Sequence, residues 1–277
     1  MIRLVATDLD GTLLDGAGEV SIRTREAITA LEEHGVVVVF VTGRPLRWMD
    51  TLWEHVGDHG LAICSNGGIV YDARRHEVVT ARTIPRATGL EVATRLREGL
   101  PGTTYALERI DGFAKEPDFM PRLPPPPDMR FGPVEDIFDD QVVKLLARHE
   151  EHPPEEYWSR AEALVGDLVT TTWSAVGTLV EISAAEVTKA STLAELCAER
   201  GITADEVVAF GDMPNDLAML EWAGTSYAMA NAHPLVREAA SRHAPRHDED
   251  GVAQVLEGLL ADGTVGNRPA AGDVPSP

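Results

Sequence analysis

Cysteine and long apolar runs are both scarce in this chain of 277 residues. The only cysteines, Cys64 and Cys197, lie in or beside apolar stretches, which favours core packing over a disulfide framework. No apolar run approaches the ~20 residues that a transmembrane helix needs. A strand-like segment begins within two residues of the start, which leaves no room for a signal peptide. We therefore expect a cytoplasmic protein that does not enter a membrane.

Positive charge is also in short supply. The chain has 24 lysines and arginines against 45 aspartates and glutamates, for a net charge of -21. Such a surface repels nucleic acids and anionic membranes, so we expect neither as a partner. Its nine histidines show no zinc-like spacing. The oligomeric state stays open.

The most informative stretch is Asp8-Leu9-Asp10-Gly11-Thr12, which follows the apolar residues 2–6. If that apolar run is a buried strand, both acids enter the loop at its carboxyl end, where α/β sheets bind ligands. Gly11 allows a sharp turn that brings the acids together. Two adjacent carboxylates repel unless a cation or a proton separates them. The pattern indicates a metal site, acid–base chemistry or both, with an ordinary turn as the alternative.

Three more apolar runs end in polar loops, and helical patterns lie between them. Strands that alternate with helices predict an α/β fold with a Rossmann-like, doubly wound parallel sheet. Because parallel strands end at one edge, we expect these loops to face a common crevice. The runs are residues 36–41 before Thr42-Gly43-Arg44, 61–64 before Ser65-Asn66-Gly67-Gly68, and 207–210 before Gly211-Asp212-Met213-Pro214-Asn215-Asp216.

Only three lysines accompany 21 arginines. A lysine kept in such a chain indicates a need for a compact point charge. Lys189 begins a helical pattern, where a cation opposes the helix dipole unless a phosphate lies nearby. For Lys115 and Lys144 the sequence predicts only solvated surface positions.

The segment between residues 68 and 187 lacks comparable loops and is too long to be a structureless connection. It holds strand patterns at 141–147 and 177–182 and helical patterns at 90–100 and 157–165. We predict an inserted α+β cap at residues 83–183, between core segments 1–82 and 184–261. Residues 262–277, rich in glycine and proline, are predicted to be disordered.

The loop motifs and Lys189 together resemble the four ordered motifs of haloacid dehalogenase-like (HAD) hydrolases over residues 1 to about 260. The Ser65–Gly68 turn, with residues 229–232 and 249–253, is most similar to the Cof-type branch of sugar-phosphate phosphatases. One departure is Ala190, where relatives usually have glycine. The resemblance implies a HAD core with an inserted cap, and a magnesium-dependent phosphatase acting on small phosphorylated metabolites, such as sugar phosphates.

The resemblance also implies roles for individual residues. Asp8 would be the nucleophile that forms an aspartyl-phosphate, and Asp10 the general acid and base. Mg²⁺ would bind the Asp8 and Asp212 carboxylates and the Asp10 backbone carbonyl. Thr42, Gly43 and Lys189 would bind the phosphoryl oxygens, with Asn215 orienting the substrate. Supporting positions are Asp216, Arg44 and Asn66.

Two other functions fit the same motifs. A phosphomutase of this fold would return the phosphoryl group to the sugar, and a catalytically idle relative would only bind ligands. The intact acids and lysine argue against the idle relative. Helix capping is the structural alternative for Asn215 and Asp216.

Overall fold

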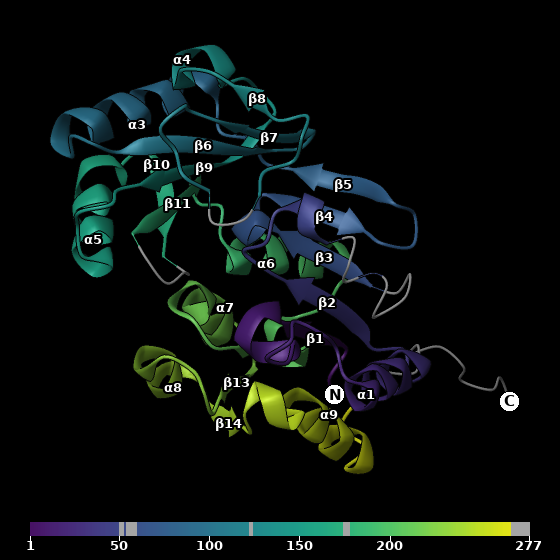
Figure 1. Cartoon of the computed structure of the whole chain (residues 1–277). Helices are drawn as coiled ribbons and strands as arrows, with labels where there is room; N and C mark the ends of the chain where they lie inside the picture. Colours follow the sequence, from purple (N-terminus) through teal and green to yellow (C-terminus); the bar gives the residue numbers. More distant parts are fainter. Residues whose placement is uncertain (50–52, 54–59, 122–123, 174–177, 267–277) are drawn as a thin grey trace, which may run out of the picture.

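The computed structural model describes residues 1–49, 53, 60–121, 124–173 and 178–266. Its strands form two sheets, one above the other in Figure 1. The larger sheet has the order β14-β13-β12-β1-β2-β3-β4-β5, and the smaller one the order β10-β11-β9-β6-β7-β8. Among these residues, no helix has both the length and the apolar character needed to cross a bilayer.

The larger sheet is built around β1 (Leu4–Thr7), whose four residues are all buried. Burial of successive residues on both faces is typical of a central parallel strand. Leu4 aligns with Val37 of β2 on one side and with Val207 of β12 on the other, and both pairings are parallel. The loops after β2 and β12 therefore flank the loop after β1. The other strands are β2 (Val37–Val41), β3 (Leu61–Cys64), β4 (Ile69–Asp72), β5 (Glu77–Ala81), β12 (Val207–Gly211), β13 (Thr225–Met229) and β14 (Arg242–Ala244).

Helices cover this sheet in two groups. The chain passes from β1 to β2 in one direction along the sheet, and from β12 to β13 and β14 in the opposite direction. Because both kinds of connection are right-handed, the helix after β1 lies on one face of the sheet, and the helices after β12 and β13 lie on the other. The helix after β14 packs beside the one after β1. This strand order and the arrangement of the helices confirm the Rossmann-like α/β prediction. These helices are α1 (Ile22–Glu33), α6 (Lys189–Glu199), α7 (Leu217–Trp222), α8 (Pro234–Ala239) and α9 (Gly251–Ala261).

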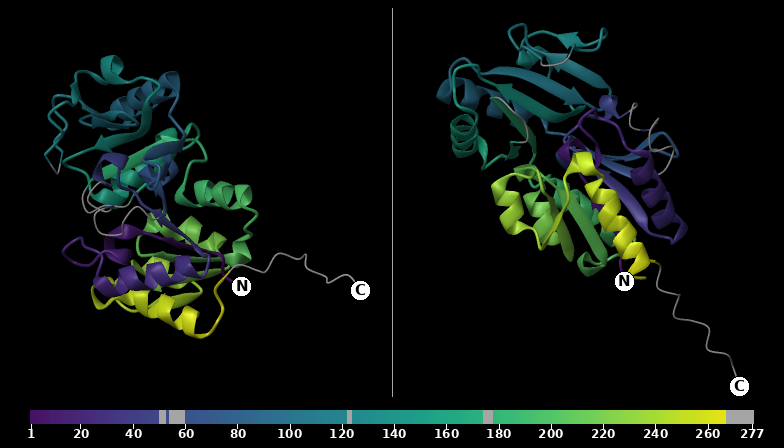
Figure 2. Two further views of the ribbon diagram at one scale, coloured as in Figure 1. Left: turned by 90° about the vertical axis from the view of Figure 1, so that its right-hand side faces the viewer. Right: turned by 60° about the horizontal axis from the view of Figure 1, so that its bottom comes forward.

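The smaller sheet comes from the segment between β5 and α6, and its strands are mostly antiparallel. Both views of Figure 2 show this segment as a distinct part stacked on the larger sheet. A hydrophobic cluster made up only of residues between Ile84 and Ile182 lies inside it, separate from the cluster of the larger sheet. Its elements are β6 (Thr104–Arg109), β7 (Gly112–Lys115), β8 (Arg130–Phe131), β9 (Val142–Arg148), β10 (Val169–Thr172), β11 (Leu179–Ala184), α3 (Arg86–Gly99), α4 (Val134–Ile137) and α5 (Pro154–Val165).

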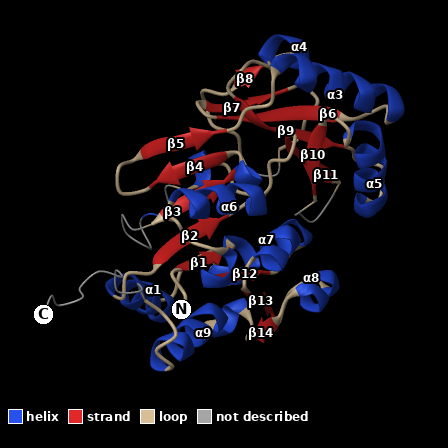
Figure 3. Cartoon of the chain, turned by 180° about the vertical axis from the view of Figure 1, so that it is seen from behind, coloured by secondary structure: helices blue, strands red, loops and turns tan. Residues whose placement is uncertain are grey.

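Two details differ from the sequence predictions. The larger sheet is not entirely parallel, because β4 and β5 extend it as antiparallel strands, visible at its edge in Figure 3. Residues 262–266, predicted to belong to a disordered tail, have a defined structure. Val265 forms a parallel bridge with Ile2 and is 7% exposed, so apolar burial orders this short segment. Residues 267–277 lie outside the described part of the chain.

Candidate active site

Asp8 directly follows β1 and lies at the centre of the predicted crevice. Its backbone N–H donates to the carbonyl of Phe210 in β12, which extends the strand pairing by one residue. The chain then enters the short helical turn η1 (Leu9–Leu13), where Gly11 has a φ of 77°. A Cβ atom on Gly11 would lie 2.3 Å from Oδ2 of Asp212, so only glycine lets this turn approach Asp212 so closely.

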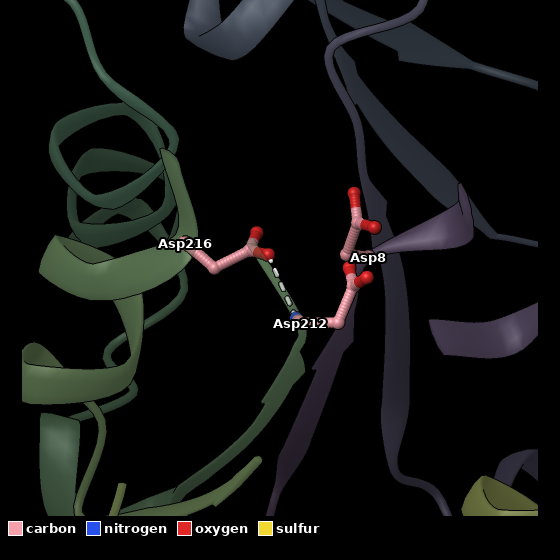
Figure 4. Close-up of side chains that lie close together, drawn as sticks. All are labelled: Asp8, Asp212 and Asp216. Atoms are coloured by element: carbon pink, nitrogen blue, oxygen red, sulfur yellow. Dashed lines mark hydrogen bonds between the residues drawn. The ribbon is translucent and has the colours of Figure 1, made fainter. Parts of the chain in front are cut away.

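Asp212 and Asp216 lie together in the loop after β12. The short helix η5 (Pro214–Asp216) places the Asp216 carboxylate beneath this loop. Its Oδ2 accepts hydrogen bonds of 3.0 Å from the backbone N–H groups of Asp212 and Met213. Figure 4 shows Asp8 and Asp212 side by side, with Asp216 pointing toward them from the opposite side. Asp216 thus fixes the backbone that carries Asp212.

Lys189 contacts both the loop after β1 and the loop after β12. It is the first residue of α6, whose N-cap Thr188 accepts a hydrogen bond from the backbone N–H of Ser191. The Lys189 Nζ lies 2.6 Å from Oδ1 of Asp8 and 2.7 Å from Oδ1 of Asp216, and all three side chains are buried. Asp216 does act as a helix cap, because its Oδ2 accepts a hydrogen bond from the backbone N–H of Met213, the N-cap residue of η5. Capping alone does not account for its Oδ1, which contacts Lys189.

Burial dominates the electrostatics of these acids. Desolvation raises the pKa of Asp8 well above its usual value, although the charge of Lys189 opposes the shift. Desolvation and the nearby charge of Asp216 raise the pKa of Asp212 to about 7. Burial alone would lower the pKa of Lys189, but the charges of Asp216 and Asp8 outweigh it and raise the pKa. One cation is thus shared among three buried acids.

This cluster fits a divalent metal ion. Asp8, Asp212 and Asp216 each offer an oxygen within 4.8 Å of the other two. Both oxygens of Asp216 already accept hydrogen bonds, whereas Asp8 and Asp212 each use one oxygen in the bonds found in the described part of the chain. Hard carboxylate oxygens and an excess of negative charge suit a cation such as Mg²⁺. Asp8 and Asp212 therefore each keep an oxygen available to a metal ion, whereas both oxygens of Asp216 are used within the described part of the chain.

Asp10 is not part of the buried cluster. Its side chain is 61% exposed, and both of its oxygens accept hydrogen bonds from the guanidinium of Arg44, at 2.6 and 2.7 Å. Arg44 follows β2, so this pair joins the loops after the two central strands. The Asp10 carboxylate thus lies at the mouth of the site.

The remaining candidate residues meet beside this pair. Oγ1 of the buried Thr42 accepts a hydrogen bond from the backbone N–H of Arg44, so its own O–H remains able to donate. The carbonyl of Thr42 accepts from the backbone N–H of Asn66. A Cβ atom on Gly43 would lie 3.1 Å from Oδ1 of Asn66, which in turn accepts from Nδ2 of Asn215. Hydrogen bonds thus link Asp10 through Arg44 to Thr42, and Thr42 through Asn66 to Asn215, which is next to Asp216 in the chain.

Sequence reasoning missed residues that hold this group together. Thr12 donates to Oδ1 of Asp212 at 3.3 Å. Asn231 donates to the carbonyl of Gly11 at 2.8 Å, which gives a role to the family-like stretch 229–232. Apart from lying within family-like motifs, neither Thr12 nor Asn231 had a sequence feature that would predict its hydrogen bond.

The predicted surface positions of Lys115 and Lys144 are wrong. Lys115 is 8% exposed, and its Nζ donates to three backbone carbonyls, those of Glu116, Pro117 and Phe119. Lys144 is 1% exposed, and its Nζ lies 2.7 Å from the carbonyl of Gly43 and 2.8 Å from Oε1 of Glu181. Both ammonium groups are buried because carbonyl or carboxylate oxygens replace water around them.

Comparisons with known proteins show which proteins this chain is similar to. The family model of haloacid dehalogenase-like hydrolases matches residues 5–256. The putative phosphatase YxeH of Bacillus subtilis is 30% identical over 275 residues, covering 94% of this chain and 99% of that protein. The 5-amino-6-(5-phospho-D-ribitylamino)uracil phosphatase YcsE of the same organism is 30% identical over 255 residues, covering 92% and 94%. A solved structure from Streptococcus mutans, 24% identical, shares the fold with a TM-score of 0.82 over 94% of this chain and all of that one.

Proposed function

We propose a mechanism and a substrate class for this chain, which belongs to the haloacid dehalogenase-like hydrolases and is a phosphatase of their Cof-type branch. The proposal is magnesium-dependent hydrolysis of small phosphorylated metabolites, of the sugar-phosphate or polyol-phosphate kind, through an aspartyl-phosphate. The observation that carries it is the buried Lys189, which bridges Asp8 and Asp216 beside Asp212.

Asp8 is the proposed nucleophile. Its oxygen forms a bond to phosphorus while the bond between phosphorus and the leaving alcohol breaks. Lys189 holds Oδ1 of Asp8 in place and faces the added negative charge with its ammonium group. A bound Mg²⁺, held by Asp8, Asp212 and the Asp10 backbone carbonyl, would supply further neutralisation of the phosphoryl oxygens.

Asp10 is the proposed general acid and base. Its carboxyl group gives a proton to the leaving oxygen and later takes one from the water that attacks the aspartyl-phosphate. The bond between Asp8 and phosphorus then breaks and inorganic phosphate leaves. Arg44 supports this role by holding the Asp10 carboxylate at the mouth of the site until the substrate enters.

The phosphate oxygens are the proposed ligands of Thr42, Gly43 and Lys189. The free O–H of Thr42 and the backbone N–H of Gly43 are donors at the end of β2, next to the loop that carries Asp8. These donors offset the repulsion that an acidic protein exerts on a phosphate dianion.

Residues 83–183 are the proposed cap, which selects the leaving group. Lys144 of β9 contacts the Gly43 carbonyl. Glu108 of β6 forms a bidentate ion pair with Arg47 of the core. These contacts bring the smaller sheet over the proposed phosphate site. The relative YcsE is named for a ribityl phosphate, a polyhydroxylated ester, which supports a substrate of that kind.

Two measurements test this function. The purified protein with Mg²⁺ is incubated with a panel of sugar phosphates, polyol phosphates and nucleotides, and the release of inorganic phosphate is followed. Acid quenching during turnover of a radiolabelled ester should leave label on the peptide that contains Asp8. Interconversion of sugar-phosphate isomers without phosphate release would show a mutase instead, and the absence of label on that peptide would contradict the aspartyl-phosphate.

A further inference from the structure

A lysine of the smaller sheet contacts the backbone of a loop in the larger sheet. Nζ of Lys144 in β9 lies 2.7 Å from the backbone carbonyl of Gly43 and 2.8 Å from Oε1 of Glu181 in β11. Lys144 is 1% exposed, and Glu181 is 8% exposed. Gly43 follows β2 and is one of the proposed phosphate donors. A buried cation of the proposed cap thus contacts the backbone of the proposed phosphate site.

The path of β9 explains how this lysine reaches the loop. The pairing of β9 with β6 shifts register, because Val142 and Lys144 align with consecutive residues of β6 and Val143 is an extra residue between them. Val143 is fully buried and belongs to the hydrophobic cluster of the larger sheet. Gly68 allows this close approach, since a Cβ atom there would lie 3.2 Å from the Cβ atom of Val143. The bulge therefore fixes β9 against the larger sheet next to Lys144.

The peptide group between Gly43 and Arg44 is held at both ends. Its carbonyl oxygen accepts the hydrogen bond from Lys144, and its N–H donates to Oγ1 of Thr42 at 3.0 Å. The Thr42 hydroxyl therefore uses a lone pair inside the protein and keeps its O–H group for another acceptor. A cation at one end of a peptide group polarises it and strengthens the hydrogen bond at the other end. The charge of Lys144 thus acts on the orientation of the Thr42 hydroxyl.

The preceding peptide group, between Thr42 and Gly43, is held from the same direction. Its carbonyl oxygen accepts a hydrogen bond from the backbone N–H of Asn66. The N–H and C=O groups of a trans peptide point in opposite directions, so the Gly43 N–H faces away from Asn66. Nδ2 of Asn66 donates to Oε2 of Glu181 at 3.0 Å. The two residues that hold the loop carbonyls, Lys144 and Asn66, are therefore both partners of one carboxylate in the smaller sheet.

We propose that Lys144 is a positioning residue for phosphoryl binding, which holds the peptide group after Gly43 and thereby directs the Thr42 hydroxyl toward the phosphate. The inference rests on the proposed phosphatase function, and it gives the smaller sheet a second role beside selection of the leaving group. Affinity for the phosphoryl group is high only while Lys144 contacts Gly43. Separation of the two sheets removes this contact, so opening of the cap assists the release of inorganic phosphate.

Binding of inorganic phosphate tests this role, because the ion carries no leaving group that the cap could contact. Removal of Lys144 alone would leave the Glu181 carboxylate buried without its cation, so the effect is measured in the E181Q background. E181Q alone keeps the contact between Lys144 and Gly43. The dissociation constant of inorganic phosphate, measured by titration calorimetry with Mg²⁺, should rise about tenfold from E181Q to K144M/E181Q, the effect of losing one hydrogen bond.

K115M is the matched control. Lys115 is a buried lysine of the same sheet, and in the described structure its Nζ donates only to backbone carbonyls of the cap segment. K115M should leave the dissociation constant unchanged. E108Q is the second control, because it weakens the bidentate contact with Arg47 between the two sheets but keeps the contact of Lys144 with Gly43. A general loosening of the cap would weaken phosphate binding in both controls.

A double-mutant cycle tests the route through the peptide group. T42V removes the hydroxyl but keeps the shape of the side chain, so it should itself weaken phosphate binding. Adding K144M to T42V/E181Q should change the dissociation constant less than about threefold, because the hydroxyl that Lys144 directs is absent. Direct contact of Lys144 with the phosphate, or a merely structural role, predicts the same tenfold change with and without the Thr42 hydroxyl.

Different results overturn different statements. An unchanged dissociation constant in folded K144M/E181Q overturns the positioning role, and a tenfold change that persists beside T42V overturns the route through the peptide group. If K144M/E181Q does not fold, as judged by circular dichroism and thermal melting, K144Q replaces it, because its amide still offers Glu181 a donor but lacks the charge. A wild-type protein that releases no phosphate from any ester overturns the proposed function, whereas failure of the cycle in an active enzyme overturns this inference alone.

Discussion

The Lys189 ammonium group lies 2.6 Å from Oδ1 of Asp8, and both side chains are buried at the end of the central strand. The contact joins residues 181 positions apart in the chain. It places the proposed nucleophile against a fixed cation, in surroundings where water screens their attraction poorly. The first predictions concern this contact and the acids around it.

Replacing Asp8 with asparagine should lower kcat by at least ~10³-fold, because the amide keeps the size of the side chain but lacks the nucleophilic oxygen. The melting temperature should not fall, since the change removes one of three crowded negative charges. The same substitution at the exposed Asp262 serves as the control and should change neither quantity. More than a tenth of the wild-type rate in D8N would contradict the covalent mechanism.

Chelation should abolish phosphate release, and added Mg²⁺ should restore it, because the available ligands are hard oxygens. Zinc should substitute poorly. D212N should raise the concentration of Mg²⁺ needed for half-maximal activity at least tenfold, since one charged ligand is lost. Magnesium titrations of initial rate measure this requirement. Full activity in excess chelator would exclude a metal-dependent reaction.

Without metal, stability should decrease as the pH rises from about 4 to about 7. The pKa of Asp212 is about 7 in the folded protein, above the value near 3.8 expected for an unfolded chain. The folded state therefore binds more protons across this range, and its advantage is complete below the unfolded pKa and lost above the folded one. Thermal melts in chelator at pH 5 and pH 8 measure the difference.

Saturating Mg²⁺ should reduce that pH dependence, because a cation beside the ionised carboxylates replaces the lost protons. D212N should reduce it as well, even in chelator. A melting temperature with the same pH dependence in D212N and wild type would show that Asp212 does not titrate in this range.

Replacing Lys189 with methionine should destabilise the protein by about 3–5 kcal/mol at pH 8, the usual cost of leaving a buried charge without its partner. The loss should be smaller at pH 5, where the raised pKa of Asp8 allows it to hold a proton. Denaturant unfolding in chelator gives both values. K115M is the matched control, because Lys115 is also buried but donates only to backbone carbonyls in the described structure, so its effect should not depend on pH.

Replacing residues 83–183 with a short Gly/Ser linker should leave a core that folds, because each part has its own hydrophobic cluster. This core keeps the acids and Lys189, so it should still cleave para-nitrophenyl phosphate slowly. Its activity on the preferred natural ester should fall much further, since the cap contacts and the exclusion of water are lost. A soluble, cooperatively folded core with unchanged preference among natural esters would show that these residues do not select the substrate.

The core sheet and the acid cluster could be predicted because their signals are local. Each of the strands β1, β2, β3 and β12 is a short apolar run that ends in a polar loop, and parallel topology brings such loops together. The hairpin of β4 and β5 carries no such pattern. The first four residues of β5 are exposed and the fifth is half-buried. Its sequence therefore lacks the alternation of apolar and polar residues that predicts a half-buried strand.

The placement of Lys144 could not be predicted because its partners are distant in the chain. Glu181 lies 37 residues away and the Gly43 carbonyl 101 residues away, and neither appears in a window around position 144. Local sequence gives only the average behaviour of lysine, which is exposure. The orientation of Asp10 toward Arg44 was missed for a related reason, since a motif identifies a side chain but not the rotamer that it adopts.

The burial of every lysine has a practical consequence for chemical labelling. Lys115, Lys144 and Lys189 are at most 8% exposed, so acylating reagents should react slowly with all three lysines of the folded chain. Each lysine becomes reactive only when its own surroundings open. Lys144 would then report separation of the two sheets and Lys189 loosening of the acid cluster, so the order in which these amines acquire mass would record which part of the molecule opens first.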